Sequence, residues 1–251
     1  MPSSSRFDLT SPTVISNAGI SNELDDSISR QAVVSTALVS IFRGNFCNLI
    51  LPNGIRTTFK KYEVIYSVGD EQRMFFFLTD GFVKVGTITA NGCEVIYDIR
   101  RGGDVVGELC VSERARPDRA VALEQTNAIG VPFEDVMKLL LTKPDMIALL
   151  MDVFCRALKE AYTQVNALAV EDTIHRLVKI LISLATKLGR PVGSLVEIPT
   201  YLTQEEIAQM VAARRERVST ALNSLRRLGM VHYSARGHLV LNVSALESHC
   251  T

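Results

Sequence analysis

The chain of 251 residues lacks the features that mark membrane and secreted proteins. No apolar run approaches the ~18 residues that a membrane span requires, and the N-terminus shows no basic segment followed by an apolar one, as a secretory signal would. The five cysteines are odd in number and widely spaced, and they form no CxxC pair. We therefore expect a cytoplasmic protein with reduced thiols.

Histidine is also scarce, which limits the catalytic and metal chemistry open to the chain. All four histidines lie at or after position 175, and there is no HExxH motif. No nucleophile, base and orienting group stand together in the sequence. We expect no enzymatic activity, no metal site and no covalent cofactor.

The chain has no net charge, with 27 basic and 27 acidic side chains, but these charges are unevenly distributed. Residues 173–251 hold ten basic and five acidic side chains, a net charge of +5, and the rest of the chain carries −5. Because a basic domain attracts polyanions, the C-terminal third predicts an acidic partner. Apolar residues make up 47% of the chain, which is enough for a globular core.

The residue composition and the spacing of apolar residues change along the N-terminal half. Residues 1–30 are rich in Ser, Thr, Asn and Pro and predict a loose tail, and residues 31–48 have the spacing of a helix. From position 51 to about 132, short apolar runs alternate with glycines, which predicts a small all-β barrel or sandwich. The pair Asn91-Gly92 predicts a tight hairpin turn in which both central residues have positive φ.

A long helix is predicted to begin at Pro144-Asp145. Its apolar positions are separated by alternating steps of four and three residues, which is a sustained heptad seam. The seam is narrower than the stripe of a bundle helix, and it favours packing against the same helix of a second copy, as a homodimer. The alternative is that it packs on the β domain. The seam residues are Ile147, Met151, Phe154, Leu158, Ala161, Val165 and Leu168.

The C-terminal region predicts a winged helix-turn-helix. An amphipathic helix over 174–188 is followed by Thr203 and Glu206, which form a capping box at the start of the next helix. A second helix is predicted from Ala213 or Arg214 until Gly229 ends it, and a strand, a turn and a strand follow over 231–241. Two short helices and a β wing are the elements of this motif.

The second of these helices begins with charges that are unfavourable for an isolated helix. It lacks a Ser, Thr, Asp or Asn cap, and its arginines face the positive end of the helix dipole. In a DNA major groove the same charged side chains become favourable, because Arg donates to guanine and Glu accepts from cytosine. The alternative is a solvated basic face. The predicted DNA contacts are Thr203, Arg214, Arg215, Glu216, Arg217, Ser219 and Thr220, with Arg226, Arg227 and Arg236 on phosphates.

Together these motifs resemble one family. The match rests on Gly69-Asp70, Phe77-Leu78, Gly81, Val83-Lys84-Val85, Gly92-x-Glu94, Gly103-Asp104-x-x-Gly107-Glu108-Leu109 and Arg119-Ala120. These strings resemble the cyclic-nucleotide-binding β-roll, and the whole order resembles the cyclic AMP receptor protein/FNR superfamily of bacterial transcription regulators. The resemblance implies an α+β fold with an effector-binding β-roll at 31–144, a dimerisation helix and hinge at 145–172, and a DNA-binding domain at 173–251.

The resemblance also implies an effector, cyclic AMP or a related cyclic nucleotide. Glu108 would accept a hydrogen bond from the ribose hydroxyl, and Arg119 would pair with the phosphate. Gly107 and Ala120 would let backbone N–H groups approach the ligand. The alternative is that Glu108 and Arg119 pair with each other or with Asp118. The other implied ligand contacts are Leu109, Cys110, Tyr162 and Thr163.

The sequence departs from the family pattern at two sites. The family reads the purine with a Thr-Ser pair, which corresponds here to Ala161-Tyr162, with Thr163 one position off. It reads its DNA half-site with Arg-Glu-x-x-x-Arg, where Arg215 and Glu216 match and Thr220 replaces the last arginine. The resemblance therefore implies a palindromic double-stranded DNA site with an altered third base contact. It also implies RNA polymerase as a partner.

Other effectors remain open at this point. Some members of the superfamily bind no ligand, and others use haem, an iron–sulfur cluster or a cyclic dinucleotide. A haem site is disfavoured because the sensor region contains no histidine. The four cysteines that precede the DNA-binding domain are scattered, which disfavours an iron–sulfur cluster. A redox switch at Cys110 is a further alternative.

Overall fold

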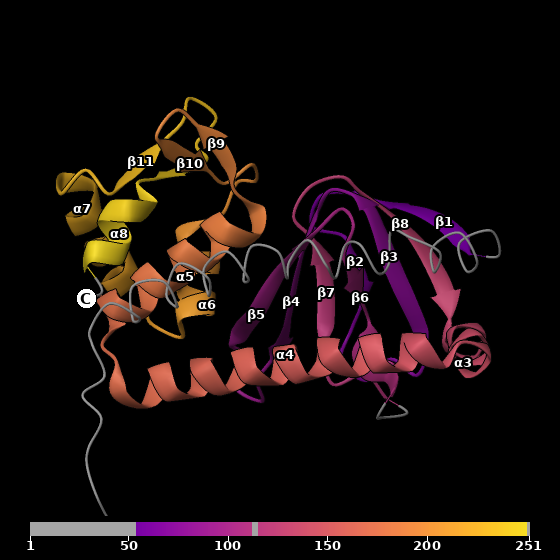
Figure 1. Cartoon of the computed structure of the whole chain (residues 1–251). Helices are drawn as coiled ribbons and strands as arrows, with labels where there is room; N and C mark the ends of the chain where they lie inside the picture. The colour runs from indigo at the N-terminus through magenta and orange to yellow at the C-terminus, as the bar shows by residue number, and fades with distance from the viewer. Residues whose placement is uncertain (1–53, 112–114, 250–251) are drawn as a thin grey trace, which may run out of the picture.

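The computed structural model describes residues 54–111 and 115–249, which form a β-roll, a long helix and a C-terminal domain (Figure 1). The predicted tail at 1–30, the predicted helix at 31–48 and Cys47 lie outside the described residues. The α+β fold predicted from the sequence is confirmed.

The β-roll consists of two antiparallel four-stranded sheets, with strand orders β1-β8-β3-β6 and β2-β7-β4-β5. Side chains alternate between the two faces of each strand. On β7, Ala120 and Ala122 are buried in the roll together with Val83 and Val85 of β4, so Arg119 points to the opposite face. The strands are β1 (Ile55–Phe59), β2 (Val64–Tyr66), β3 (Met74–Asp80), β4 (Phe82–Ile88), β5 (Glu94–Arg101), β6 (Val105–Val106), β7 (Arg119–Ala122) and β8 (Thr126–Pro132).

The hairpin between β4 and β5 is present, but its turn differs from the prediction. The Gly92 N–H donates to the Thr89 carbonyl at 2.8 Å, and the Thr89 N–H donates to the Cys93 carbonyl at 2.9 Å. Gly92 has a φ of +77°, and Asn91 has a negative φ. The prediction of two positive φ angles was therefore wrong. The loop has three residues, and its last residue, a glycine, adopts the left-handed conformation.

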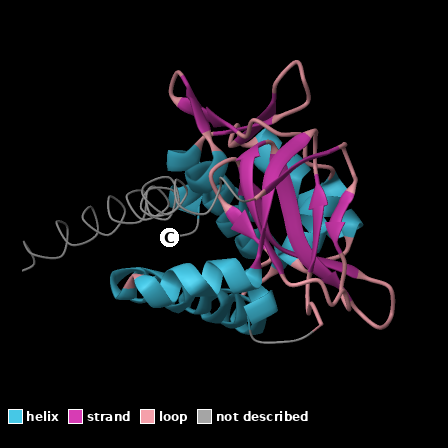
Figure 2. Cartoon of the chain, turned by 90° about the vertical axis from the view of Figure 1, so that its right-hand side faces the viewer, coloured by secondary structure: helices cyan, strands magenta, loops and turns pink. Residues whose placement is uncertain are grey.

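Two helices follow the roll: α3 (Phe133–Thr142) and α4 (Pro144–Val170). Pro144 begins α4, as predicted, at the first helical position, where its missing N–H is not needed. Figure 1 shows α4 running past the roll to the C-terminal domain, and Figure 2 shows it outside the two sheets. Most of the predicted seam is exposed, with Leu158 at 51% and Val165 at 60%, and Phe154 is half-buried. The β domain does not cover these side chains.

The C-terminal domain has a helical core and a four-stranded antiparallel sheet of order β11-β12-β10-β9. Asp172 caps α5 by accepting from the His175 N–H at 2.9 Å. Ala212, with a φ of +52°, ends α6 in the left-handed conformation. The elements are α5 (Thr173–Leu188), β9 (Arg190–Val192), β10 (Leu195–Glu197), α6 (Gln204–Val211), α7 (Arg215–Arg227), β11 (Val231–Tyr233), β12 (Leu239–Leu241) and α8 (Val243–His249). The hairpin β9–β10 and α8 were not predicted.

The predicted capping box at the start of α6 is confirmed. The Thr203 hydroxyl accepts from the Glu206 N–H at 3.1 Å, and the Glu206 carboxylate accepts from the Thr203 N–H at 2.9 Å. We expect Thr203→Ala to lower the free energy of unfolding of this domain by about 1 kcal/mol, because an N–H of the first turn loses its acceptor. Chemical denaturation measures this loss. Thr203→Ser, which keeps the hydroxyl, is the control, and an equal loss in both variants would contradict the capping role.

The C-terminal domain packs on the β-roll through α6, which lies against β5. Ile96 and Ile99 of β5 belong to the same buried apolar cluster as Leu181 of α5 and Ile207 of α6. The hydrophobic core therefore continues from one domain into the other. This packing sets the position of the helix-turn-helix relative to the roll.

Candidate functional site

The segment that follows β6 forms a tight turn and a short 3-10 helix, η3 (Glu108–Val111). Gly107 occupies the turn with a φ of +91°, and its Cα faces the Met74 carbonyl and the Arg116 guanidinium. A Cβ at this position would lie 2.7 Å from that carbonyl oxygen. The backbone therefore requires glycine here, both for its conformation and for space.

Arg116 supports this turn from inside the roll, and the sequence analysis missed it. The residue is 2% exposed. Its guanidinium donates to the Met74 carbonyl at 2.7 Å and to the Gly107 carbonyl at 3.3 Å, and it stacks 4.0 Å from the centre of the Tyr66 ring. Because the segment around it carries several charges, nothing in its sequence context distinguishes it from a solvated arginine.

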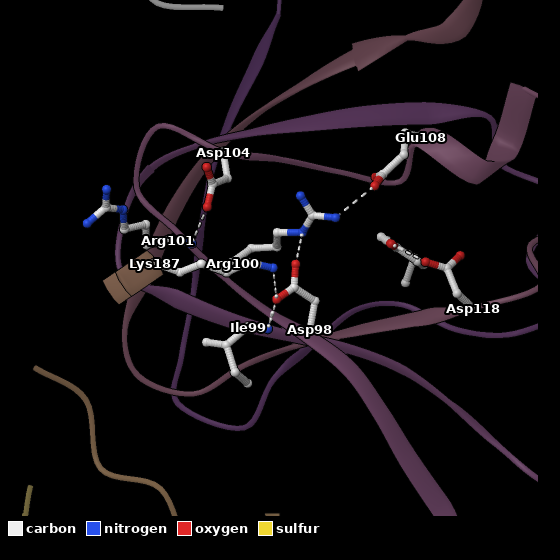
Figure 3. Close-up of polar contacts among 9 residues, drawn as sticks. Asp98, Ile99, Arg100, Arg101, Asp104, Glu108, Asp118 and Lys187 are labelled. Carbon is white, nitrogen blue, oxygen red and sulfur yellow. Dashed lines mark hydrogen bonds and ion pairs between the residues drawn. The ribbon is translucent and has the colours of Figure 1, made fainter. Parts of the chain in front are cut away.

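Glu108 faces a cation of β5. Its Oε1 lies 3.3 Å from Nη2 of Arg100, whose Nε lies 3.1 Å from Asp98 (Figure 3). Burial raises the pKa of the Glu108 carboxyl, and the positive charge of Arg100 acts in the opposite direction. The side chain as a whole is 27% exposed.

Arg119 points away from the roll interior and lies 4.0 Å from Glu94 of β5. Its Nε is buried and makes no hydrogen bond with any residue that the structure describes. Asp118 accepts a 2.9 Å hydrogen bond from the Tyr66 hydroxyl, and burial raises the pKa of the Asp118 carboxyl. The structure therefore does not bring Glu108 and Arg119 together. Each has another ion-pair partner. The alternative predicted an ion pair between Glu108 and Arg119, or between one of them and Asp118, and neither kind of pair is formed.

The remaining ligand candidates belong to three different elements, η3, β7 and α4. Leu109 is exposed and Ala120 is buried in the roll. Tyr162 is exposed on α4, and the Thr163 hydroxyl donates to the Lys159 carbonyl at 2.9 Å, one turn back. Among the described residues, no hydrogen bond or ion pair joins Tyr162 or Thr163 to Glu108.

The described cysteines do not form a cluster. Cys93 is exposed in the hairpin loop, Cys110 is buried in η3 and Cys155 is exposed on α4. Over residues 54–111 and 115–249, no three side chains of Cys, His, Asp or Glu gather as a metal site would require. Burial raises the pKa of the Cys110 thiol, which disfavours the reactive thiolate that a redox switch needs.

The start of α7 presents exposed charges without a cap. Arg214 is the N-cap residue, and its side chain makes no capping hydrogen bond. Arg215, Glu216 and Arg217 are exposed, and none of them forms an ion pair with a described residue. Val218, Leu222 and Leu225 bury the opposite face. The helix therefore holds its charged first turn towards solvent. Ser219 is half-buried, and the Thr220 hydroxyl donates to the Glu216 carbonyl at 2.9 Å.

A basic groove lies beside the C-terminal half of α7. Its lining residues are Asn223, Arg226, Arg227, Val231, His232 and Tyr233. The Arg226 guanidinium stacks 5.2 Å from the centre of the Tyr233 ring, which orients it at the rim of the groove. A concave surface with two arginines suits a phosphate group. Figure 1 places α7 and β11 at the end of the molecule away from the roll.

Comparisons with known proteins match both domains. A family model described as the cyclic nucleotide-binding domain matches residues 56–143, and one described as the Crp-like helix-turn-helix domain matches residues 175–249. The CRP-like cAMP-activated global transcriptional regulator of Mycobacterium tuberculosis is 26% identical over 183 residues, covering 72% of this chain and 82% of that protein. The fumarate and nitrate reduction regulatory protein of Salmonella typhimurium is 24% identical over 189 residues, covering 75% of this chain and 76% of that protein.

Solved structures show the same fold. A mutant of CooA from Carboxydothermus hydrogenoformans superposes with a TM-score of 0.66 at 23% identity, covering 80% of this chain and 89% of that one. Within the described residues, no helix combines the length and the apolar character needed to cross a bilayer.

Proposed function

We propose that this chain, which belongs to the cyclic AMP receptor protein/FNR (Crp/Fnr) superfamily of DNA-binding transcription regulators, works as a homodimer on a palindromic DNA site under the control of a cyclic nucleotide. The observation that carries the DNA-reading role is the uncapped start of α7. There Arg214, Arg215, Glu216 and Arg217 remain exposed without a described ion-pair partner. We place this activity in the cytoplasm, with RNA polymerase as a further partner. As a regulator it would have no enzymatic activity of its own.

The exposed seam of α4 supports the proposed homodimer. Seven apolar positions at heptad spacing need a partner helix, and the described chain supplies none over Leu158 and Val165. A twofold axis along this seam would place two α7 helices on one face of a duplex. Half-sites would then be separated by one helical turn, ~34 Å.

Two arginine variants test the DNA-reading role. Arg215 at the start of α7 is assigned to a base edge, and Arg226 in the groove is assigned to a phosphate. We expect Arg215→Ala to reduce the preference for a palindromic site selected from random DNA by about 1–3 kcal/mol for each half-site, with little change on random DNA. We expect Arg226→Ala to weaken both complexes equally and to lower the salt dependence by about one counterion.

Salt-dependent gel shifts on selected and random duplexes measure both effects. Glu247→Gln is the control, because this charge change lies on α8, at a distance along the chain from the predicted contacts. Equal losses on both duplexes for Arg215→Ala would contradict its base-reading role.

The cyclic nucleotide is supported by the chemistry of the segment around Gly107. The Glu108 carboxylate could accept from a ribose hydroxyl, and the Arg119 Nε makes no hydrogen bond with a described residue, while its guanidinium lies 4.0 Å from Glu94. The backbone at Gly107 and Ala120 would complete the phosphate site. Calorimetry with cyclic AMP and cyclic GMP tests this proposal, and Arg119→Ala should abolish any binding that is seen.

One observation favours a second candidate function. Glu108 and Arg119 hold separate ion pairs, with Arg100 and with Glu94, so no preformed nucleotide clamp joins them. A regulator of the same fold that needs no ligand, or that senses a cyclic dinucleotide or redox state, accounts for this arrangement. DNA affinity that is the same with and without every candidate nucleotide would support it.

A further inference from the structure

The basic groove beside α7 shares a face of that helix with two of the predicted DNA contacts. Glu216, Thr220, Asn223 and Arg227 follow one another at steps of four, three and four residues, which places them in one stripe along a helix. All four side chains are exposed, and the stripe lies opposite the buried face of α7. Asn223 and Arg227 also line the groove. A duplex that is read by the start of α7 therefore passes over the groove.

The groove lies too far along α7 to reach the same bases. Each residue of a helix advances the chain by about 1.5 Å, so Asn223 lies about 10 Å and Arg227 about 17 Å beyond Glu216. The major groove is about 12 Å wide. A helix that enters it with its first turn brings side chains this far along to the rim, where the phosphates lie. The chemistry to expect in the groove is therefore that of phosphate binding.

His232 lines this groove, and the fold holds its ring by one nitrogen. The ring Nε2 lies 3.0 Å from the Gly229 carbonyl oxygen, just past the end of α7. Because a carbonyl oxygen only accepts, Nε2 carries the hydrogen, and Nδ1 is the nitrogen that gains or loses a proton. No hydrogen bond joins Nδ1 to a residue that the structure describes. The exposed ring therefore keeps one nitrogen for a ligand.

The charges around His232 suit an anion. Arg226 and Arg227 face the groove from α7, and none of the described residues that line it is acidic. The neighbouring strand β12, which pairs with β11, carries no ionisable side chain. Burial raises the pKa of the Tyr233 hydroxyl, so this group stays neutral at physiological pH. A proton on His232 would add a third positive charge to the groove, and a phosphate group stabilises that charge.

We propose that His232 contacts a backbone phosphate of the duplex in its protonated form, so that DNA affinity depends on pH. The inference rests on the proposed function in one respect, namely that α7 reads the major groove. Nδ1–H would donate a charge-assisted hydrogen bond to a phosphate oxygen, beside the guanidinium of Arg226. Because the bound phosphate favours the protonated ring, affinity falls as the pH rises through the range in which imidazole titrates, about pH 5–8. The arginines keep their charge over this range.

His232→Gln tests this contact, because the glutamine amide can still donate to the Gly229 carbonyl but cannot take up a proton. Gel shifts on the selected palindrome over a series of salt concentrations, at about pH 6 and about pH 8, give the readout. In the parent chain, the slope of log affinity against log salt should be steeper at the lower pH by about 0.9 for each half-site. Affinity at the lower pH should be about fivefold higher for each half-site. His232→Gln should lose both differences.

Two further variants serve as controls. His232→Lys carries a positive charge at both pH values, so it should show the steep slope at both. His249→Gln removes an imidazole from the end of α8, outside the groove, and should behave as the parent chain.

A parent chain whose salt slope is the same at both pH values would overturn the inference. So would a pH-dependent slope that His232→Gln retains in full. In either case, binding to the palindrome would show that the proposed DNA-reading role still stands. A parent chain that binds no duplex at either pH would overturn the proposed function and this inference together.

Discussion

Leu158→Asp is expected to convert the protein to a monomer and to weaken its binding to a palindromic duplex by at least about a hundredfold. In a parallel pair of helices, the two copies of a seam residue meet across the twofold axis. Two carboxylates would then face each other in an apolar layer, where neither finds a partner. In the single chain Leu158 is 51% exposed, so the aspartate faces water and the fold of the monomer is retained.

The loss in DNA affinity is large because one dimer engages two half-sites. Once the first half-site is bound, the second binding event is intramolecular, and a monomer loses this advantage. Asn166→Asp adds the same charge next to the seam, where the side chain is exposed and outside the heptad positions, and it should leave the dimer intact. Analytical ultracentrifugation and a gel shift on the same samples give the two readouts. A Leu158→Asp protein that stays dimeric, or a monomer with parental affinity, would contradict the proposed interface.

Local patterns in the sequence predict the fold well where a few neighbouring residues decide the structure. Thr203 and Glu206 predict the start of α6, because both partners of the capping box lie within one turn. Pro144 predicts the start of α4 for the same local reason. The strands β9 and β10 were missed because β9 is exposed and β10 is half-buried along its whole length, so neither shows an alternating pattern.

The site was less predictable because its partners are distant in the chain. Glu94 and Arg119 lie on different strands, and Lys187 reaches Asp98 across 89 residues. No periodicity encodes such pairs, since they depend on strand register and on the packing of α6 against β5. The resemblance to a known family located Glu108 and Arg119, but it did not reveal that each already holds another ion pair. The role of Arg116 could not be predicted for the same reason, because its burial depends on Tyr66 and Met74 from earlier strands.

Gly107→Ala is expected to lower the free energy of unfolding of the β-roll by about 3 kcal/mol. The residue has a φ of +91°, a conformation that costs alanine energy wherever it occurs. The new Cβ would also lie 2.7 Å from the Met74 carbonyl oxygen and 2.9 Å from Nη1 of Arg116. Neither atom moves easily, because the first belongs to β3 and the second is buried and hydrogen-bonded. Urea denaturation followed by circular dichroism measures the loss.

Gly69→Ala separates the two contributions to this loss. Gly69 has a φ of +90°, nearly the same as Gly107, but no described atom beyond its chain neighbours lies within 4 Å of the position that an alanine methyl group would occupy. Its substitution should therefore cost about 1 kcal/mol, the conformational part alone. The difference of about 2 kcal/mol between the two variants is then assigned to the close approach of Met74 and Arg116. Equal losses of unfolding free energy in the two variants would mean that Arg116 moves aside for the methyl group. The buried guanidinium would then not hold the turn before Glu108 rigidly.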